Sequence, residues 1–309
     1  MKRKFGDIDS STKTILDKEF NLNPPSWLFD FIDLCRSINE DDPLNALKDL
    51  NLRLVGPFER FISPESKTDS ITHAFFYDPP EFLTLISSTH RSGLHWGVYR
   101  DKPEDQPSAI WCNDSSVDCK FTATHASPFG LVETLLKKEN DKSTNGFKES
   151  KHSLKLAKIQ SSLAKFSLPS LYGPPGHSRQ KNIQGKTFSG FGISVPFDKL
   201  TQVGYRELPV GAKELGQMLE KIRSAPKEKR DTKKLEEVLN WVNIGNDECD
   251  FGMGLEFGHN LFSADRPGTE LVFSKITLLV LKNAYTLLGR ERWVHPLEKL
   301  IDKRKTANH

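Results

Sequence analysis

Apolar residues recur every three or four positions along two stretches in the second half of the chain, residues 211–223 and 231–244. This spacing gathers the apolar side chains on one face of a helix, so two amphipathic helices are predicted there. Residues 270–288 are apolar on nearly every side, which is typical of the central helix of a core. The apolar positions of the two amphipathic stretches are Leu215, Met218, Leu219 and Ile222, and then Leu235, Val238, Leu239 and Val242.

The helix over residues 231–244 should end at Gly245 and Asn246, because both residues adopt the left-handed conformation of a helix C-terminus at little cost. The residues that follow, from Asn246 to Gly258, are then interpreted as a loop. Its glycines allow either unusual backbone angles or the close approach of another surface.

Short runs rich in β-branched and aromatic residues fill much of the first half, separated by Gly, Pro, Asn and Asp. This punctuation is typical of an antiparallel sheet. Ser26 can cap a helix with Trp27 and Phe31 on one face, and a helix over residues 128–138 would cover one face of the sheet. The expected strands are residues 52–55, 73–77, 82–86, 94–99 and 109–112.

The chain is therefore predicted to be an α+β protein, and its 309 residues favour two domains. We expect a flexible basic tail over residues 1–12 and an N-terminal scaffold domain with the antiparallel sheet over residues 13–140. A linker that includes a helix near 153–166 would span residues 141–184. A more helical C-terminal domain, opened by a strand over 188–195, would occupy residues 185–309.

Composition excludes several classes of protein. The chain has 44 Lys and Arg against 41 Asp and Glu, a net charge of +3, which argues against a dedicated nucleic-acid binder. Lys275 and Lys282 interrupt the longest apolar region, so no membrane span is expected. The N-terminus lacks the apolar stretch of a signal peptide, and the four cysteines form no CxxC pair. We expect a soluble protein of a reducing compartment, without a zinc site.

Two basic clusters near the ends, residues 2–4 and 303–305, each have the composition of a nuclear import signal. A solvated terminus explains the same composition, so the clusters alone do not decide the compartment.

The acidic residues Asp247, Glu248 and Asp250 follow directly on the predicted helix end. Carboxylates are unfavourable at a helix C-terminus, which carries partial negative charge, and neighbouring carboxylates raise one another's proton affinity. A sequence that accepts both penalties is a candidate functional site. The alternative, favoured by composition alone, is a solvated acidic loop.

A second candidate segment, residues 203–209, contains Tyr205 and Arg206. The guanidinium offers forked donors for a carboxylate or phosphate, and Tyr and Arg are common in interface hot spots. Alternatively, Arg206 forms a surface pair with Glu207 or Asp198 and contributes little.

Other chemistry has weak support. The glycine spacing after residue 251 does not match the dinucleotide fingerprint, and no serine-hydrolase, Walker or kinase motif is present. A lone Cys249 is more often a packed residue than a nucleophile. Glu256, His259 and Asp265 could join Asp250 around a metal, but no known ligand spacing supports this.

Residues 203–209 (Val-Gly-Tyr-Arg-Glu-Leu-Pro) and 246–256 (Asn-Asp-Glu-Cys-Asp-Phe-Gly-Met-Gly-Leu-Glu) together resemble motifs of the histone PARylation factor family. Residues 54–57 (Leu-Val-Gly-Pro) and 76–82 (Phe-Tyr-Asp-Pro-Pro-Glu-Phe) resemble further blocks of that family in the same order, as does the region 186–196. Phe251 stands where many members have tyrosine.

The resemblance implies an accessory factor, not an enzyme by itself. Members bind the catalytic domain of DNA-break-activated poly(ADP-ribose) polymerases, and the polymerase holds NAD. Glu248 matches the glutamate that serves as base for serine ADP-ribosylation of histones and of the polymerase. Tyr205, Arg206, Asp247 and Asp250 match positions that hold the partner. The resemblance further implies nuclear localisation at DNA breaks, with a cytoplasmic pool also allowed, no resident cofactor or metal, and no direct nucleic-acid contact.

The residues support this chemistry, because a serine hydroxyl needs a base and a carboxylate stabilises the positive charge that develops on the ribose. Two other hypotheses stay open. The chain could be a passive interaction module without a catalytic residue, or a hydrolase that uses Asp247, Glu248 and Asp250 with or without a metal.

Overall fold

A computed structural model describes residues 10–143, 151–166, 169–176 and 179–306. The basic cluster at residues 2–4, most of the expected tail and parts of the expected linker lie outside this range. The chain divides into two compact units, which interleave in sequence. The first comprises Met1–Ala74, Phe82–Asp118 and Thr122–Gly176, and the second comprises Phe75–Glu81, Cys119–Phe121 and His177–His309. The α+β class is confirmed, and the predicted domain limits at residues 140 and 185 stay predictions.

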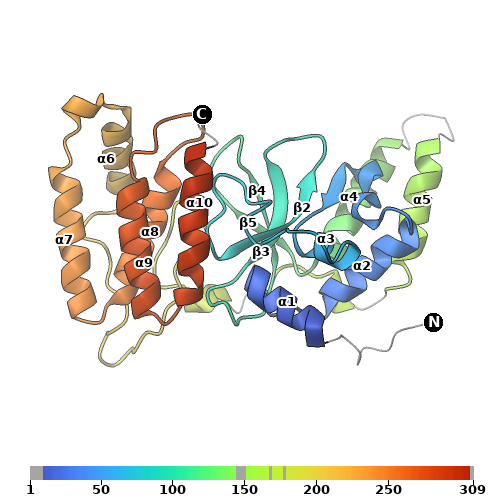
Figure 1. Cartoon of the computed structure of the whole chain (residues 1–309), viewed down its shortest axis with the longest axis horizontal. Coiled ribbons are helices and arrows are strands. Elements are labelled where there is room, and N and C mark those ends of the chain that lie inside the picture. Colours follow the sequence, from blue (N-terminus) through green and yellow to red (C-terminus); the bar gives the residue numbers. More distant parts are fainter. Residues whose placement is uncertain (1–9, 144–150, 167–168, 177–178, 307–309) are drawn as a thin grey trace. The chain divides into compact units, whose positions relative to one another are not determined.

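The first unit contains a five-stranded sheet in which each strand pairs antiparallel with the next (Figure 1). Its central strands are largely buried on both faces. Four of the five expected strands are confirmed within a few residues, whereas β5 was not foreseen. The strands are β1 (Leu52–Leu54), β2 (Phe82–Ser88), β3 (Leu94–Tyr99), β4 (Ile110–Asp114) and β5 (Thr122–His125).

The expected strand over residues 73–77 is wrong, because side chains bond the local backbone there and close turns instead. Asp69 Oδ1 accepts the N–H groups of Ile71 and Thr72, each at 3.0 Å. A little further on, Asp78 Oδ2 accepts the N–H of Phe75 at 2.9 Å. Within residues 73–77, the Phe75 N–H is thus occupied by Asp78, and the Ala74 N–H bonds the Ile71 carbonyl at 3.0 Å, so neither group is available for a strand ladder.

The helices of the first unit pack around a core of large apolar side chains, in which the Phe31 ring meets those of Phe58 and Phe129. The helix after Ser26 and the helix from Pro128 are confirmed, although Ser26 forms no side-chain cap bond. The helices are α1 (Ser10–Phe20), α2 (Trp27–Ile38), α3 (Pro57–Ile62), α4 (Pro128–Ser143) and α5 (Lys151–Leu163), with short 3₁₀ turns at Pro43–Asn45, Lys48–Leu50 and Pro169–Leu171.

The second unit is a helical bundle in which α8 is buried along nearly its whole length. Both predicted amphipathic helices are confirmed, as α6 and α7 (Figure 1). The helices are α6 (Ala212–Ser224), α7 (Lys233–Asp247), α8 (Phe251–Ala264), α9 (Ser274–Leu287) and α10 (Val294–Thr306), with 3₁₀ turns at Arg179–Asn182, Lys227–Lys229 and Glu291–Trp293.

Three expectations for this unit are wrong. Residues 251–258 are the start of α8 and not a loop, so α8 takes the central place expected of residues 270–288. Helix α9 lies at the surface, with Leu279 63% exposed. The expected strand over 188–195 is reduced to a single bridge between Gly185 and Ile193.

The second basic cluster is not a solvated terminus. Arg304 lies in α10 and is buried, with its guanidinium 4.1 Å from the ring centroids of Phe76 and Phe262. Its Nη2 donates to the Phe262 carbonyl at 2.9 Å. Burial lowers the pKa of Arg304 to about 10, even though Asp265 opposes this shift.

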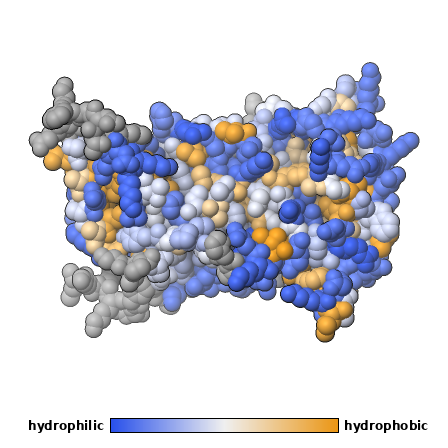
Figure 2. Space-filling view, turned by 180° about the vertical axis from the view of Figure 1, so that it is seen from behind, coloured by the Kyte–Doolittle hydropathy of each residue, from blue (hydrophilic) through white to orange (hydrophobic). Residues whose placement is uncertain are grey.

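The face turned away from Figure 1 is mostly hydrophilic, with hydrophobic residues in small separate groups (Figure 2). No helix in the described ranges has both the length and the apolar character needed to cross a bilayer.

Candidate functional site

Helix α7 ends and α8 begins within three residues, Glu248, Cys249 and Asp250. The N–H of Asp250 bonds the Gly245 carbonyl at 2.7 Å, and the N–H of Cys249 bonds the Asn246 carbonyl at 3.1 Å. This pair of bonds is the Schellman arrangement, with its left-handed position filled by Cys249 at φ +66°. The expected end at Gly245 and Asn246 is therefore wrong by a few residues, because both residues lie inside the last turn.

The short connection brings Glu248 and Asp250 to the same nitrogen of one guanidinium. Arg206 Nη2 lies 2.5 Å from Glu248 Oε2 and 3.0 Å from Asp250 Oδ2. The Glu248 side chain is 51% exposed, whereas the Asp250 side chain is 4% exposed. Arg206 therefore joins one surface carboxylate to one buried carboxylate, and the alternative pairings with Glu207 or Asp198 are not formed.

The backbone of Gly204 fixes Arg206 in this place. Its N–H donates to Asp250 Oδ1 at 3.0 Å, and its carbonyl accepts the N–H of Gly252 at 2.9 Å. Gly204 has φ +117°, and a Cβ there would lie 2.1 Å from the Pro196 carbonyl oxygen. Only glycine fits both conditions. Two segments more than forty residues apart in sequence are thereby held together at the start of α8.

A second close approach occurs at Gly252, in the first turn of α8. A Cβ there would lie 2.9 Å from the Tyr205 ring and 3.0 Å from the Gly204 carbonyl oxygen. Of the two roles expected for the glycines of this segment, close approach of another surface is the one that Gly252 fills.

The Tyr205 side chain points into the second unit, away from the Arg206 side chain. Its hydroxyl donates to Glu256 Oε2 at 2.7 Å, and Glu256 is 8% exposed. Burial raises the pKa of the Glu256 carboxyl, Glu207 adds to that rise, and the Tyr205 hydrogen bond opposes it. Burial, the bond to Glu256 and the nearby acids raise the pKa of Tyr205. The tyrosine thus anchors the segment that presents Arg206.

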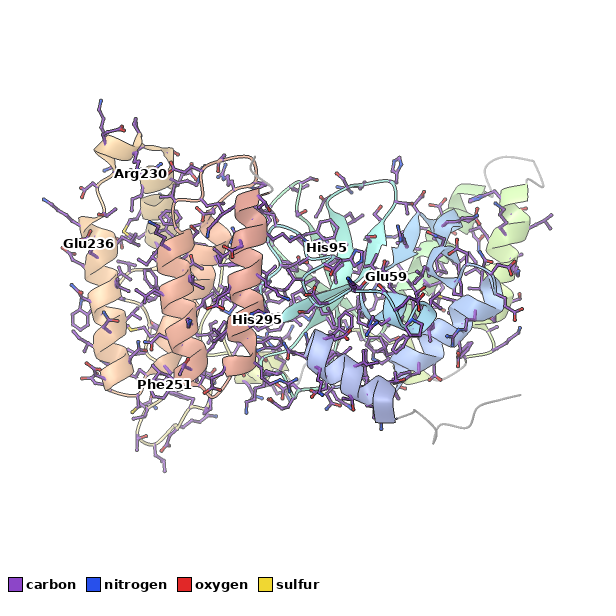
Figure 3. The ribbon with its side chains drawn as sticks, in the orientation of Figure 1. Glu59, His95, Arg230, Glu236, Phe251 and His295 are labelled. Carbon is purple, nitrogen blue, oxygen red and sulfur yellow. The ribbon has the colours of Figure 1, made fainter. Side chains whose placement is uncertain are left out.

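The electrostatic setting of the acids differs from the sequence argument, because α8 begins at Phe251. A helix N-terminus carries partial positive charge, so the start of α8 offsets the unfavourable end of α7. Figure 3 shows Phe251 at one end of these helices and Glu236, near the start of α7, towards the other.

The acids considered as joint metal ligands have separate partners. Glu256 bonds Tyr205, Asp250 bonds Arg206, and Asp265 Oδ1 accepts backbone N–H groups of residues 272 and 273. His259 Nε2 lies 3.0 Å from Glu81 Oε1 in a buried pair that also receives the Tyr285 hydroxyl at 2.7 Å. Within the described ranges, no cluster of three or more such side chains is arranged to hold a metal.

Asp247, in the last turn of α7, is exposed and forms no side-chain hydrogen bond or ion pair within the described residues. Asp247, Glu248 and Arg206 are therefore accessible, while Asp250 and Tyr205 support them from within. The roles of these five residues toward a partner stay predictions.

Sequence reasoning missed an exposed apolar set near this junction. Trp241 is 49% exposed and Ile244 is 44% exposed, both on α7. Leu200 and Val203, in the segment before Gly204, are exposed as well. The signal was present, because Trp241 and Ile244 lie outside the apolar stripe of α7. Apolar residues on a helix's polar face are typical of a binding surface.

This chain is similar to known proteins over nearly its whole length. Residues 11–304 match the sequence profile of the family described as Histone PARylation factor 1. The mouse protein "Histone PARylation factor 1" is 29% identical over 325 residues, covering 99% of this chain and 91% of the mouse protein. The zebrafish protein of the same name is 32% identical, covering 95% and 86%. A human protein named "Putative histone PARylation factor 1-like" is 29% identical, covering 99% and 91%.

Proposed function

Since the chain belongs to the histone PARylation factor family, we propose that it completes the active site of a poly(ADP-ribose) polymerase and supplies Glu248 as the base for serine ADP-ribosylation. The acceptors are histones and the polymerase itself. The polymerase holds NAD, and this chain contributes side chains only.

One observation carries the proposal: Glu248 is half exposed at a rigid helix junction. The Schellman bonds and the buried Asp250 fix the backbone on both sides of it. A base has to lie within about 2.6–3.2 Å of the proton that it removes, and a rigid junction can hold that geometry. A carboxylate that is half exposed on the surface fits a base that acts after a second protein has docked.

Glu248 has two chemical roles in this reaction. A serine hydroxyl attacks well only when a base takes its proton. The ribose carbon gains positive character as nicotinamide leaves, and a carboxylate beside it stabilises that charge. The bond between C1″ and nicotinamide breaks, the bond from serine oxygen to C1″ forms, and the serine proton passes to Glu248.

Arg206 controls the availability of this base. Its guanidinium pairs with Glu248 Oε2 in the free chain, so that carboxylate oxygen is occupied before a partner docks. We infer that docking separates the pair, while Asp250 retains Arg206 at its place. The arginine then faces the partner, together with Asp247 and the segment that Tyr205 anchors.

The surroundings of the site suit a protein partner and a basic substrate. Trp241, Ile244 and Val203 offer exposed apolar area for a polymerase domain. Asp247 and Glu207 add negative charge without a cation paired to them in the described residues, which favours acceptor serines next to Lys or Arg. Histone tails have that composition, so we place the protein in the nucleus at DNA breaks.

The test is an NAD assay with a purified polymerase, nicked DNA and a histone tail peptide, with linkage sites read by mass spectrometry. Glu248→Gln should bind the polymerase as wild type does and lose serine modification by at least a hundredfold, in line with loss of a general base. Asp302→Asn, an exposed acid on α10, is the matched control and should behave as wild type.

If Glu248→Gln remained fully active, Glu248 would not be the base and the chain would be a passive interaction module. Turnover by the chain without a polymerase would instead support a hydrolase.

A further inference from the structure

Glu256, in the second turn of α8, is a buried acid bonded to the segment that carries Arg206. It is 8% exposed, and its Oε2 accepts the Tyr205 hydroxyl at 2.7 Å. Within the described part of the chain, neither of these two side chains forms another hydrogen bond or an ion pair. A buried carboxylate is costly unless a donor satisfies it. Glu256 therefore favours the arrangement in which the Tyr205 hydroxyl stays bonded to it.

Two glycines pack closely around this bond. A Cβ at Gly252 would lie 2.9 Å from the Tyr205 ring. A Cβ at Gly185 would lie 2.6 Å from the Tyr205 hydroxyl and 2.7 Å from Glu256 Oε2. Gly252 and Glu256 are four residues apart, so they lie on the same face of α8. Backbone therefore packs against both the ring and the bonded carboxylate, which leaves the Tyr205 side chain little room to move.

The segment around Arg206 is thus attached to α8 at two points. At the first, Asp250 Oδ1 accepts the Gly204 N–H at 3.0 Å. At the second, Glu256 accepts the Tyr205 hydroxyl. Arg206 follows directly on Tyr205, so its backbone position depends on both attachments. Without the second attachment, the segment would have to be ordered when a partner docks, and such ordering lowers affinity.

We propose that Glu256 is a positioning residue for docking: through the Tyr205 hydroxyl it holds Arg206 in the arrangement that the polymerase recognises. The proposal rests on the docking function proposed above for this surface. It gives a buried acid outside the junction of α7 and α8 an influence on affinity, although its carboxylate faces Tyr205 and not the partner.

The test measures the Kd between the full-length chain and a purified polymerase on nicked DNA, without NAD. Tyr205→Phe and Glu256→Met each remove the bond and should raise the Kd about tenfold, the effect of losing a hydrogen bond to a charged group. Glu256→Gln keeps an acceptor oxygen for the tyrosine and should stay within about threefold of wild type. Rescue by Gln but not by Met would show that the acceptor oxygen matters and not the length of the side chain.

Tyr285→Phe is the matched control, because it removes a bond of the same kind and length elsewhere in the second unit. The Tyr285 hydroxyl donates to the buried Glu81 at 2.7 Å. This variant should bind the polymerase with the wild-type Kd, even if its free energy of unfolding falls as far as that of Tyr205→Phe. Circular dichroism at the temperature of the titration verifies that every variant is folded.

The double variant Tyr205→Phe/Glu256→Met should bind no more weakly than the weaker of its single variants, because all three lack the same bond. Additive losses would overturn the proposal, since Glu256 would then act by a route other than Tyr205. A Kd for both single variants equal to that of Tyr285→Phe would overturn it as well. Both of these results leave the role of Glu248 intact, because binding is measured without NAD. If the wild-type chain bound no polymerase, the positioning role and the proposed function would both be wrong.

Discussion

The Arg206 guanidinium lies 2.5 Å from Glu248 and 3.0 Å from Asp250, and the side chains of these two acids are 51% and 4% exposed. The same cation therefore takes part in two pairs of different energetic weight. Exposed pairs contribute about 0–1 kcal/mol, whereas a buried carboxylate that loses its partner is costly. The pair with the buried Asp250 holds the arginine, whereas the pair with the exposed Glu248 can be broken at little cost. This is the behaviour that a docking-dependent base requires.

Arg206→Ala should lower the free energy of unfolding by about 1–3 kcal/mol, because Asp250 is left buried with the Gly204 N–H but without a counter-charge. Adding Asp250→Asn should recover most of that loss. Urea denaturation of both single variants and the double variant gives the coupling energy. Strictly additive losses would mean that Arg206 does not stabilise Asp250.

Glu248→Gln should change the free energy of unfolding by less than about 1 kcal/mol, as expected for an exposed pair. The same urea series measures it. If Glu248→Gln lost as much stability as Arg206→Ala, the pair between Arg206 and Glu248 would be structural. The loss of activity of Glu248→Gln could then not be assigned to the missing base.

Gly252→Ala should be destabilising, whereas Gly254→Ala should be close to neutral. A Cβ at Gly252 would lie 2.9–3.0 Å from Tyr205, Val195 and the Gly204 backbone, so the Arg206 segment has to move. Such overpacking costs about 1–3 kcal/mol. At Gly254 the nearest atom is 3.3 Å away, and the better helix propensity of alanine, about 1 kcal/mol, should offset the contact. Thermal unfolding and polymerase binding of the pair check this, and equal effects would contradict it.

Cys249→Gly should raise the free energy of unfolding by about 0.5–1 kcal/mol, because glycine adopts the left-handed conformation of Cys249 without strain. Cys249→Ala, which keeps a Cβ, is the control and should be close to wild type. If glycine were no more stable than alanine in urea denaturation, the left-handed residue would not be strained.

Glu256→Gln should alter how stability depends on pH. The folded-state pKa of Glu256 is raised above its usual value of 4.5 by burial, so the folded chain binds this proton more tightly than the unfolded chain. The resulting stability is present below the unfolded pKa and is lost as pH rises through the folded pKa. Gln cannot ionise, so Glu256→Gln should gain stability relative to wild type as pH rises above about 4.5. A difference independent of pH would contradict a raised pKa.

Periodicity located the amphipathic helices α6 and α7, since a one-sided apolar stripe is visible in sequence. It failed for α8, because a helix buried on all sides has no polar face, and its glycines are poor helix formers. Glycine is needed where another segment packs closely against the helix, as at Gly252. Such contacts between distant segments are not visible in a single sequence.

The residues of the candidate site could be predicted from the sequence, but the contacts between them could not. Asp247, Glu248 and Asp250 stood out as an acidic cluster, and Arg206 as a candidate binding residue. That Arg206 pairs with Glu248 and Asp250, and that Asp250 is buried, depends on Gly204 bonding to the start of α8. The exposed Trp241 and Ile244 were visible as breaks in the polar face of α7 and were overlooked.

The bonds between Gly204 and the start of α8 also bear on which insertions this chain can tolerate. The two parts of the site meet through space, so the chain between them, which includes α6 and the turn at Lys227–Lys229, need not keep a fixed length. A residue added to that turn would leave the spacing of Arg206 and Glu248 unchanged. A residue added between Asp247 and Phe251 would disrupt the cap bonds to the Gly245 and Asn246 carbonyls, and with them the spacing of Glu248 and Asp250 at Arg206. Length variation among relatives should therefore collect in the turn after α6 and be absent from the three residues between α7 and α8.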